Sequence, residues 1–192
     1  MKTSSEFESP VLDVIRMRRS KRAYSDRPIE SDKIRSLFEA ARWAPSSRND
    51  QPWTYMYATK DQPELWNKLF ALLSPSNQVW AKDAPLLVLS LARKNFAMNG
   101  RPNESAKYDL GAANAFLALQ ATELGLNLHQ MGGYDHQRAL DDLNIPDTYD
   151  LGAMMAIGYH GDPSSLSVDL LQREIGPRYR YIQDDFVMNK PF

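Results

Sequence analysis

One uninterrupted apolar stretch limits what this chain can fold into. It runs from Ala84 to Ala92 (APLLVLSLA) and contains no charged residue. A helix needs about 20 consecutive apolar residues to cross a bilayer, and this stretch is about half as long. Short continuous apolar runs are typical of strands that are covered on both faces. The sequence therefore predicts a buried strand over residues 85–92.

Length and composition favour one globular domain over residues 1–192. Of the 192 residues, 43% are hydrophobic and 24% are charged, which is ordinary for a soluble protein with its own core. Lys and Arg number 23 and Asp and Glu number 24, so the net charge of −1 provides no overall field for binding nucleic acid or anionic lipid. We therefore expect neither a nucleic-acid partner nor a membrane partner, and any basic site has to be local.

Two absences narrow the chemistry. The chain has no cysteine, which excludes disulfides, thiolate nucleophiles and Cys-ligated zinc or iron–sulfur clusters. His129, His136 and His160 lack metal-ligand spacing, so we interpret them as structural or surface residues and expect no metal site.

The opening MKTSSEFESP is polar where a secretory signal needs a basic start and an apolar core, which predicts a cytoplasmic protein.

Apolar periodicity predicts helices and strands that are intermingled along the chain. Ser9 and Pro10 predict the start of a first helix that carries Arg18 near its end. Further helices are predicted over 34–44, 64–73, 105–125 and 136–143, and further strands over 53–58, 127–131 and 151–158. The alanines of 105–125 suit a central helix packed on several sides, and its small residues permit close helix approach at a subunit interface. The tail from about residue 177 has too little periodicity for a core, so we expect an arm that packs on a partner subunit.

The segment Arg16 to Arg22 (RMRRSKR) concentrates positive charge directly after the first predicted helix. It holds five cations within seven residues, with the hydroxyl of Ser20 among them. A phosphate monoester accepts several charge-assisted hydrogen bonds, and the planar guanidinium of arginine matches its geometry. This composition indicates an anion site. A solvated basic face or a nucleic-acid patch is the alternative interpretation, because most charge runs only solvate a surface.

A second polar segment follows the second predicted helix. Ala44 to Trp53 (APSSRNDQPW) places small polar side chains between two prolines. Prolines stiffen such a loop, and hydroxyl and amide groups can donate to and accept from the edge of a planar heterocycle. A capped helix end with a surface turn is the alternative.

In order and spacing, these segments resemble the paired N-terminal signature of the nitroreductase family. Arg18 to Tyr24 (RRSKRAY) is followed about twenty residues later by Ala41 to Trp53 (ARWAPSSRNDQPW). The rest of the family pattern follows in order: Asn77 before Trp80, the Ala-rich helix, Met131 to Asp135 (MGGYD) and Arg178 to Arg180 (RYR). Gly132-Gly133 stands where many family members carry Glu-Gly, and the resemblance covers nearly the whole chain.

The resemblance implies an α+β sandwich, in which a central, mostly antiparallel sheet has helices on both faces. It also implies an interlocked homodimer with two sites for flavin mononucleotide (FMN) in the interface. Pro45, Ser46, Ser47 and Asn49 come from the other subunit in this arrangement, so a monomer is not expected to hold flavin tightly.

The resemblance further implies the residues that contact FMN. Arg18 and Ser20 hold the phosphate and ribityl chain, and the tail adds Arg178 or Arg180. Arg22 meets the N1–C2 carbonyl edge of the ring, Asn77 meets the pyrimidine edge, and residues 131–133 present backbone near N5 and O4. The full set is Arg18, Arg19, Ser20, Arg22, Pro45, Ser46, Ser47, Asn49, Gln51, Asn77, Met131, Gly132, Gly133, Arg178 and Arg180.

The implied activity is an oxidoreductase that takes hydride from NADH or NADPH and reduces a nitroaromatic, quinone or related acceptor by a ping-pong mechanism. Flavin N5 carries the chemistry, so no side chain is named as catalytic. The alternatives are a flavin reductase or reductive dehalogenase on the same scaffold, a flavin-binding module without turnover, and a nucleic-acid binder that uses Arg16 to Arg22. The sequence has no G-x-G-x-x-G and no P-loop, so a Rossmann dinucleotide site is not supported.

Overall fold

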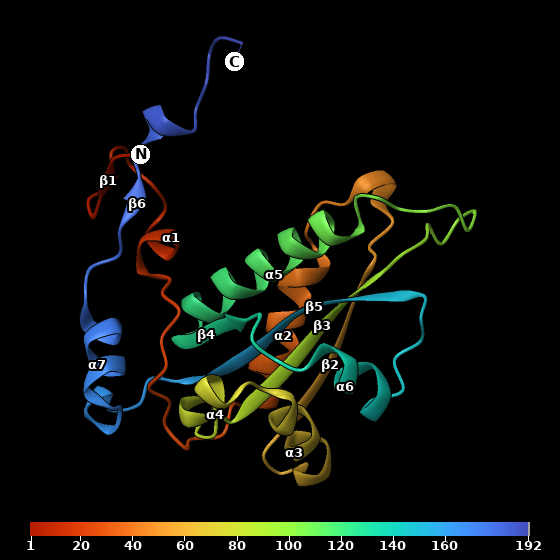
Figure 1. Cartoon of the computed structure of the whole chain (residues 1–192), viewed down its shortest axis with the longest axis horizontal. Helices are drawn as coiled ribbons and strands as arrows, with labels where there is room; N and C mark the ends of the chain where they lie inside the picture. The colour runs from red at the N-terminus through yellow and green to blue at the C-terminus, as the bar shows by residue number, and fades with distance from the viewer. Residues whose placement is uncertain (192) are drawn as a thin grey trace.

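Four strands form the sheet at the centre of the molecule (Figure 1). The computed structural model describes residues 1–191, and Phe192 lies outside the described part. The strands are β2 (Trp53–Thr59), β3 (Leu86–Arg93), β4 (Leu126–Met131) and β5 (Tyr149–Tyr159). Their order is β2-β3-β5-β4, and every neighbouring pair is antiparallel. The predicted antiparallel sheet is confirmed, and each predicted strand agrees with an observed one to within two residues at either end.

The apolar stretch of the sequence is β3, which pairs with a strand on each side and is covered on both faces. Successive side chains of a strand point to opposite faces of the sheet. Leu87 and Leu89 accordingly belong to one cluster of buried residues, and Leu86 and Val88 belong to the other. The strand thus contributes to two apolar layers at once, which explains why its sequence does not alternate with polar residues.

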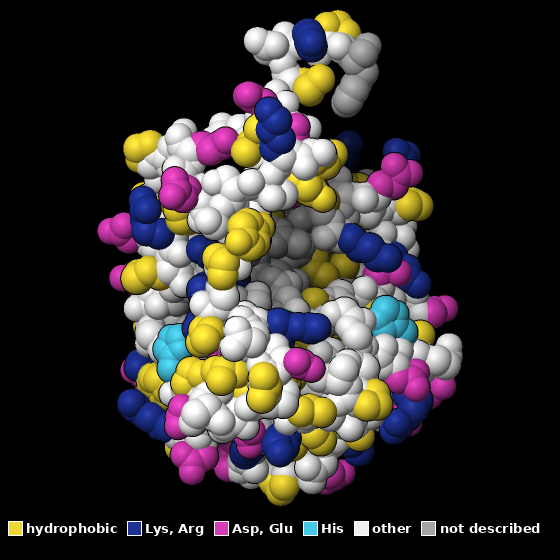
Figure 2. All heavy atoms as spheres, turned by 60° about the vertical axis from the view of Figure 1, so that its left-hand side comes forward, with side chains coloured by type: hydrophobic (Ala, Val, Ile, Leu, Met, Phe, Trp, Pro, Cys, Tyr) yellow, Lys and Arg dark blue, Asp and Glu magenta, His cyan; other side chains and the backbone are white. Residues whose placement is uncertain are grey.

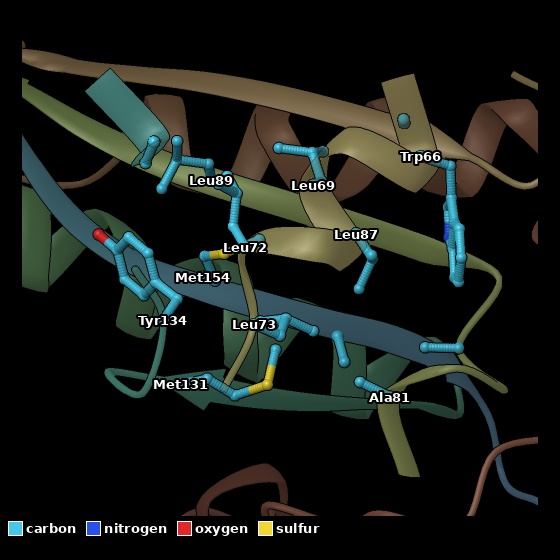
Figure 3. Close-up of a cluster of buried hydrophobic side chains, with 14 of the residues drawn as sticks. Trp66, Leu69, Leu72, Leu73, Ala81, Leu87, Leu89, Met131, Tyr134 and Met154 are labelled. Carbon is cyan, nitrogen blue, oxygen red and sulfur yellow. The ribbon is translucent and has the colours of Figure 1, made fainter. Parts of the chain in front are cut away.

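Helices cover the sheet on both faces, as predicted. One face carries α2 (Ser31–Arg42) and α5 (Ala106–Glu123), and the other carries α3 (Pro63–Leu72), α4 (Pro75–Ala81) and α6 (His136–Asp142). Figure 3 shows the second of these layers, where Leu69 and Leu72 of α3 lie beside Leu87 and Leu89 of β3. The helices predicted over 34–44, 64–73, 105–125 and 136–143 are confirmed, whereas α4 is a short helix that the periodicity did not predict.

Helix α5 packs against the sheet and against α2, and part of its surface stays exposed. Leu110, Ala113 and Leu117 are buried, whereas Tyr108 is 81% exposed and Phe116 is 41% exposed. The expectation of packing on several sides is confirmed for the sheet and α2, while the side that carries Tyr108 is open within the single chain. A helix that is apolar all round is normally buried all round, so this exposed side lacks a cover in the single chain.

The two ends of the chain pair with each other, apart from the sheet. β1 (Thr3–Ser4) runs antiparallel to β6 (Arg180–Tyr181), and in Figure 1 this pair lies beside α1 (Asp13–Met17), above α7 (Val168–Ile175). The predicted start of the first helix is wrong, because α1 begins at Asp13 and not at Pro10. Val11 and Ile15 are exposed, so no core contact extends the helix to the proline.

A chain of buried polar groups ties α5 to an irregularity in the sheet. β3 pairs with β5 with a register shift between Leu89 and Leu91, where Ser90 is fully buried. Ser90 Oγ donates to the carbonyl of Ala153 over 2.8 Å and accepts from Asn114 Nδ2 over 3.2 Å. The hydroxyl of Tyr55 in turn donates to Asn114 Oδ1 over 3.0 Å. Asn114 therefore satisfies polar groups from two strands at once.

Replacing Asn114 is expected to destabilise the protein. The Asn114→Ala variant leaves the Tyr55 hydroxyl without its acceptor and takes away the partner that donates to Ser90, at a cost of about 1–3 kcal/mol. Chemical denaturation monitored by circular dichroism measures the change. Gln137→Ala on the exposed side of α6 is the control and should stay within about 0.5 kcal/mol of the parent. Equal effects of the two substitutions would contradict this account of Asn114.

Candidate functional site

The basic segment after α1 is in contact with the C-terminal tail. Arg18 is the residue that ends α1, and its Nη1 donates to the hydroxyl of Ser20 over 3.3 Å. Arg178 reaches back from the tail and donates to the carbonyl oxygens of Arg18 and Arg16. Residues more than 150 positions apart in the chain are thereby joined.

Three arginines line one cavity of about 330 Å³. They are Arg18, Arg178 and Arg180, and the remaining wall comes mainly from residues 4–8, which include Glu6 and Glu8, with Ile15, Tyr181 and Ile182. Figure 2 shows the molecule turned toward the side of α1 and α7, where the surface is hollowed and Lys and Arg side chains lie around the hollow. The structure therefore brings together the two tail arginines and Arg18.

These arginines repel one another, and no carboxylate in residues 1–191 forms an ion pair with any of them. Burial lowers the pKa of the Arg18 guanidinium, and the charges of Arg180 and Arg19 lower it further. Burial and the charge of Arg18 lower the pKa of Arg178 in the same way. Because arginine stays protonated in proteins, the three guanidinium groups outnumber the two lining carboxyl groups, of Glu6 and Glu8, and the cavity favours an anionic ligand.

A second pocket, of about 310 Å³, is also lined by Arg18. Arg18 and Ser20 form its polar edge, and its floor comes from α5 and β4. The floor residues are Ala115, Ala118, Leu119, Leu128 and Gln130. A cationic cavity that adjoins a mostly apolar pocket suits a ligand with a phosphate at one end and an organic body at the other. Gln130 is a lining residue that the sequence motifs did not indicate.

Arg19 points away from this cavity. Its guanidinium donates to the carbonyl of Gly176 after α7, and the ammonium of Lys21 donates to the carbonyl of Glu174 over 3.3 Å. The structure thus separates Arg19 from Arg18 although they are neighbours in the sequence. Both cations anchor the basic segment to the C-terminal end of α7, where a helix favours positive charge.

Arg22 lies over an aromatic group at the edge of the sheet. Its guanidinium carbon is 5.9 Å from the ring centroid of Trp80, and that ring lies 4.6 Å from the ring of His129. His129 Nδ1 lies 3.0 Å from the carbonyl oxygen of Lys21, and because a carbonyl only accepts, Nδ1 carries the ring proton. Burial lowers the pKa of His129 to about 4. The imidazole is therefore neutral near pH 7 and serves as a structural residue, as predicted.

Asn77 and the Gly132-Gly133 turn are in contact. Asn77 Nδ2 donates to the carbonyl of Gly133 over 2.9 Å, and the backbone N–H of Ser74 donates to the same oxygen over 3.0 Å. A Cβ atom at Gly133 would lie 3.0 Å from both Asn77 Nδ2 and Ser74 Oγ, so the turn approaches α4 closely because the residue is glycine. The side chain of Met131 is buried in the core.

The loop from Pro45 to Gln51 lies elsewhere in the chain. The backbone N–H of Ser47 donates to the buried carboxylate of Asp109, near the start of α5, over 3.0 Å. Arg18 shares its pocket with Ala118, nine residues further along α5, which corresponds to roughly 14 Å of helix. The structure therefore does not bring this loop and the arginines together within one chain.

The loop is strained and held by a carboxylate that sequence reasoning missed. Arg48, Asn49 and Gln51 all have φ between 50° and 55°, which is unfavourable for residues with side chains. Asp50 accepts from Arg93 Nη2 and from the backbone N–H of Ala97, each over 2.9 Å. Asparagine tolerates this conformation better than most residues, so Asn49 was the available signal, whereas Arg48 and Gln51 gave none.

The neutral state of His129 predicts a pH dependence of stability. The folded pKa of about 4 lies below the ordinary value of 6.5, so the unfolded chain binds the proton more readily. The free energy of unfolding should therefore fall as the pH is lowered from 6.5 to about 4, by up to about 3 kcal/mol. Urea denaturation between these pH values measures the loss. His129→Gln should remove this component and His136→Gln, at an exposed position, should retain it; parallel profiles for both variants would contradict the assignment.

Comparison with known proteins agrees with this α+β fold and indicates an oxidoreductase. The model of the nitroreductase family matches residues 15–159. The chain therefore belongs to the nitroreductase family.

Individual relatives resemble most of the chain. A protein from Rhodopseudomonas palustris named for NADH dehydrogenase/NAD(P)H nitroreductase activity is 28% identical over 183 residues, covering 85% of this chain and 91% of the relative. A crystal structure described as an oxidoreductase containing FMN is 36% identical with a TM-score of 0.92, covering 100% of this chain and 98% of the other. A nitroreductase from Desulfovibrio desulfuricans, solved in complex with FMN, is 26% identical with a TM-score of 0.73, covering 97% and 99%.

Two further findings concern metals and membranes. Among residues 1–191, no group of three or more His, Cys, Asp or Glu side chains is arranged to hold a metal ion. Within the same residues, no helix is long and apolar enough to cross a membrane. The cytoplasmic location stays a prediction.

Proposed function

We propose that this protein binds FMN and uses NADH or NADPH to reduce a nitroaromatic, quinone or related acceptor by a ping-pong mechanism. The observation that carries the proposal is the convergence of Arg18, Arg178 and Arg180 on one cavity, where none of the three forms an ion pair within the described residues although Glu6 and Glu8 also line the wall. FMN is the cofactor named for two of the structural neighbours, and NAD(P)H is the donor named for the Rhodopseudomonas relative.

The residues present fit such a cofactor. The three arginines suit its phosphate, and the pocket that begins at Arg18 and Ser20 suits the organic part of the molecule. Among the described residues the side chain of Arg22 has no hydrogen-bonded partner and only the ring of Trp80 beside it, so its guanidinium is available for a carbonyl edge. Asn77 and the Gly132-Gly133 turn form a polar wall with closely approaching backbone.

FMN would supply the redox chemistry, by accepting hydride from the nicotinamide and then passing electrons to the acceptor. The side chains orient the cofactor and set the charge around it, and a cation at the N1–C2 edge stabilises the reduced, anionic ring. No side chain of the cluster is required as a nucleophile or as a general acid. The nicotinamide and the acceptor use the same open face in turn, which is the basis for the ping-pong order.

We also propose that the active form is a homodimer in which each site takes residues from both subunits. Two observations support this. The exposed side of α5 presents Tyr108, Phe116 and the small residues Gly111, Ala112 and Ala115, which is an apolar surface without a cover. The strained loop around Asn49 lies too far along α5 to reach Arg18 of the same chain. The C-terminal arm, with Tyr179, Tyr181 and Phe186 exposed, is proposed to pack on the partner subunit.

The activity is tested by stopped-flow mixing of purified protein with NADH or NADPH under anaerobic conditions. The flavin absorbance should bleach with at least one of the two donors, and adding a nitroaromatic or quinone should restore it. Steady-state rates with nitroaromatics, quinones, free flavins and halogenated aromatics then rank the acceptors. A protein that is yellow but never bleaches would be a flavin-binding module, and the proposed reaction would be wrong.

The proposed phosphate site is tested with two substitutions in the same basic segment. Arg18→Ala removes a cation that lines the cavity, and each charge-assisted hydrogen bond lost should raise the Kd for FMN by about 10- to 100-fold. Arg16→Ala removes an exposed cation stacked on Phe7 and should change the Kd by less than about threefold. Equal changes in the Kd of the two variants would favour the alternative that the basic segment is only a solvated surface. Isothermal titration of the apoprotein with FMN gives both values.

A mixed dimer tests whether the site is shared between subunits. Co-expression of Arg18→Ala and Ser47→Trp chains with different affinity tags yields a dimer in which one site carries both changes and the other carries neither. If the loop acts in the partner's site, the mixed dimer should retain about one tightly bound FMN per two chains, although each parent variant binds weakly. Absence of tight binding in the mixed dimer would place the loop and Arg18 in the same chain's site.

A further inference from the structure

Glu174 is a buried carboxylate that binds the backbone of the basic segment. It lies in the last turn of α7 and is only 2% exposed, whereas no other residue of that helix is buried. Its two carboxylate oxygens accept from the backbone N–H of Arg22 over 3.1 Å and 2.9 Å, and one of them accepts from the N–H of Ala23 over 3.2 Å. These contacts join residues about 150 positions apart.

The same stretch of backbone is held from its other side. The carbonyl of Lys21 lies 3.0 Å from His129 Nδ1 and accepts from the hydroxyl of Tyr24 over 3.3 Å. The Tyr24 hydroxyl has one proton, which it shares with the nearer carbonyl of Ala156 in β5 at 2.9 Å. The peptide groups that flank Arg22 are therefore fixed to α7 on one side and to the sheet on the other.

The side chain of Arg22 is left unpaired by this arrangement. No hydrogen bond or ion pair joins its guanidinium to another residue in the part of the chain that the structure describes. Burying a carboxylate costs several kcal/mol, and a salt bridge to Arg22 would offset that cost directly. Glu174 instead accepts from the main chain, so the charge of Arg22 stays available for a ligand while its Cα position is fixed.

We propose that Glu174 is a positioning residue that holds Arg22 against the ring edge of the bound flavin and thereby raises the midpoint potential of the flavin. This rests on the proposed FMN site. The role acts through Arg22 alone, since Glu174 accepts from the backbone and has no exposed surface from which to touch a ligand.

The test measures the midpoint potential of bound FMN in a double-mutant cycle. Glu174→Gln is similar in size but places an amide group opposite the N–H donors of Arg22 and Ala23, which loosens the segment. The potential should become more negative, because the cation near the reduced ring is less well held, and the Kd for FMN should rise by about tenfold or less. In an Arg22→Gln background the same change should have little further effect on the potential.

The sign of the shift separates positioning from simple electrostatics. Removing a negative charge near the flavin would by itself make the potential more positive, so a positive shift overturns the proposal. A shift of the midpoint potential that is equal in size with and without Arg22 also overturns the proposal. So does a lower Tm with an unchanged potential, which is the result expected for a merely structural residue. Asp169→Asn, at an exposed position on α7, is the matched control and should leave the potential unchanged.

Two further measurements test the proposal even if Glu174→Gln does not fold. If Glu174→Gln does not fold, Glu174→Asp keeps the charge on a shorter side chain and should shift the potential in the same direction by a smaller amount; no shift overturns the proposal. Amide hydrogen exchange at Arg22 and Ala23 should accelerate in either variant without added FMN. A colourless parent protein that cannot be reconstituted with FMN would instead refute the proposed FMN site. If substitution of Arg22 changes the potential but substitution of Glu174 does not, only this inference is refuted.

Discussion

The pairing of β3 with β5 is the interaction on which the other elements depend. Both strands have a partner on each side, and their side chains enter the apolar clusters above and below the sheet. Each of the two helical layers packs against these strands, so the positions of the helices follow from the pairing of β3 with β5. β4 is placed along the free edge of β5, and its end at Met131 sets the position of the Gly132-Gly133 turn. The polar wall of the candidate site is thus a consequence of strand pairing in the core.

Helix α5 separates the strained loop from the arginine cavity. Its N-terminal turn binds the strained loop through Asp109, and its middle forms the floor beneath Arg18. A helix is rigid at 1.5 Å per residue, so a single chain cannot close this gap. The exposed apolar side of α5, with Tyr108 and Phe116, lies along the same helix. Association of two chains through that side would cover the apolar surface and supply the missing half of each site in one step.

The sequence predicted the elements that carry strong periodicity and missed those that depend on distant partners. Ile34 to Ala41 and the run after Ala84 identify α2 and β3 because their apolar spacing is local information. Ser9-Pro10 was misleading, since a capping pattern starts a helix only where packing supports it, and Ile15 is exposed. The site motifs identified Arg18, which lies with the tail arginines, and also Asn77 and Gly133, which are in contact with each other. They could not identify Asp50, Asp109 or Glu174, because the donors of those carboxylates lie far away in the chain or on backbone groups.

The basic cluster also links folding to ligand binding. Arg18, Arg178 and Arg180 approach one another from the first helix and the tail, and their mutual repulsion opposes that approach. The short β1–β6 pair and the hydrogen bonds from Arg178 to backbone carbonyls are what hold the tail there in the absence of an anion. An anion bound between the guanidinium groups converts repulsion into attraction, so its binding energy also stabilises the terminal arms. Binding of an anion and ordering of the two chain ends therefore belong to one equilibrium.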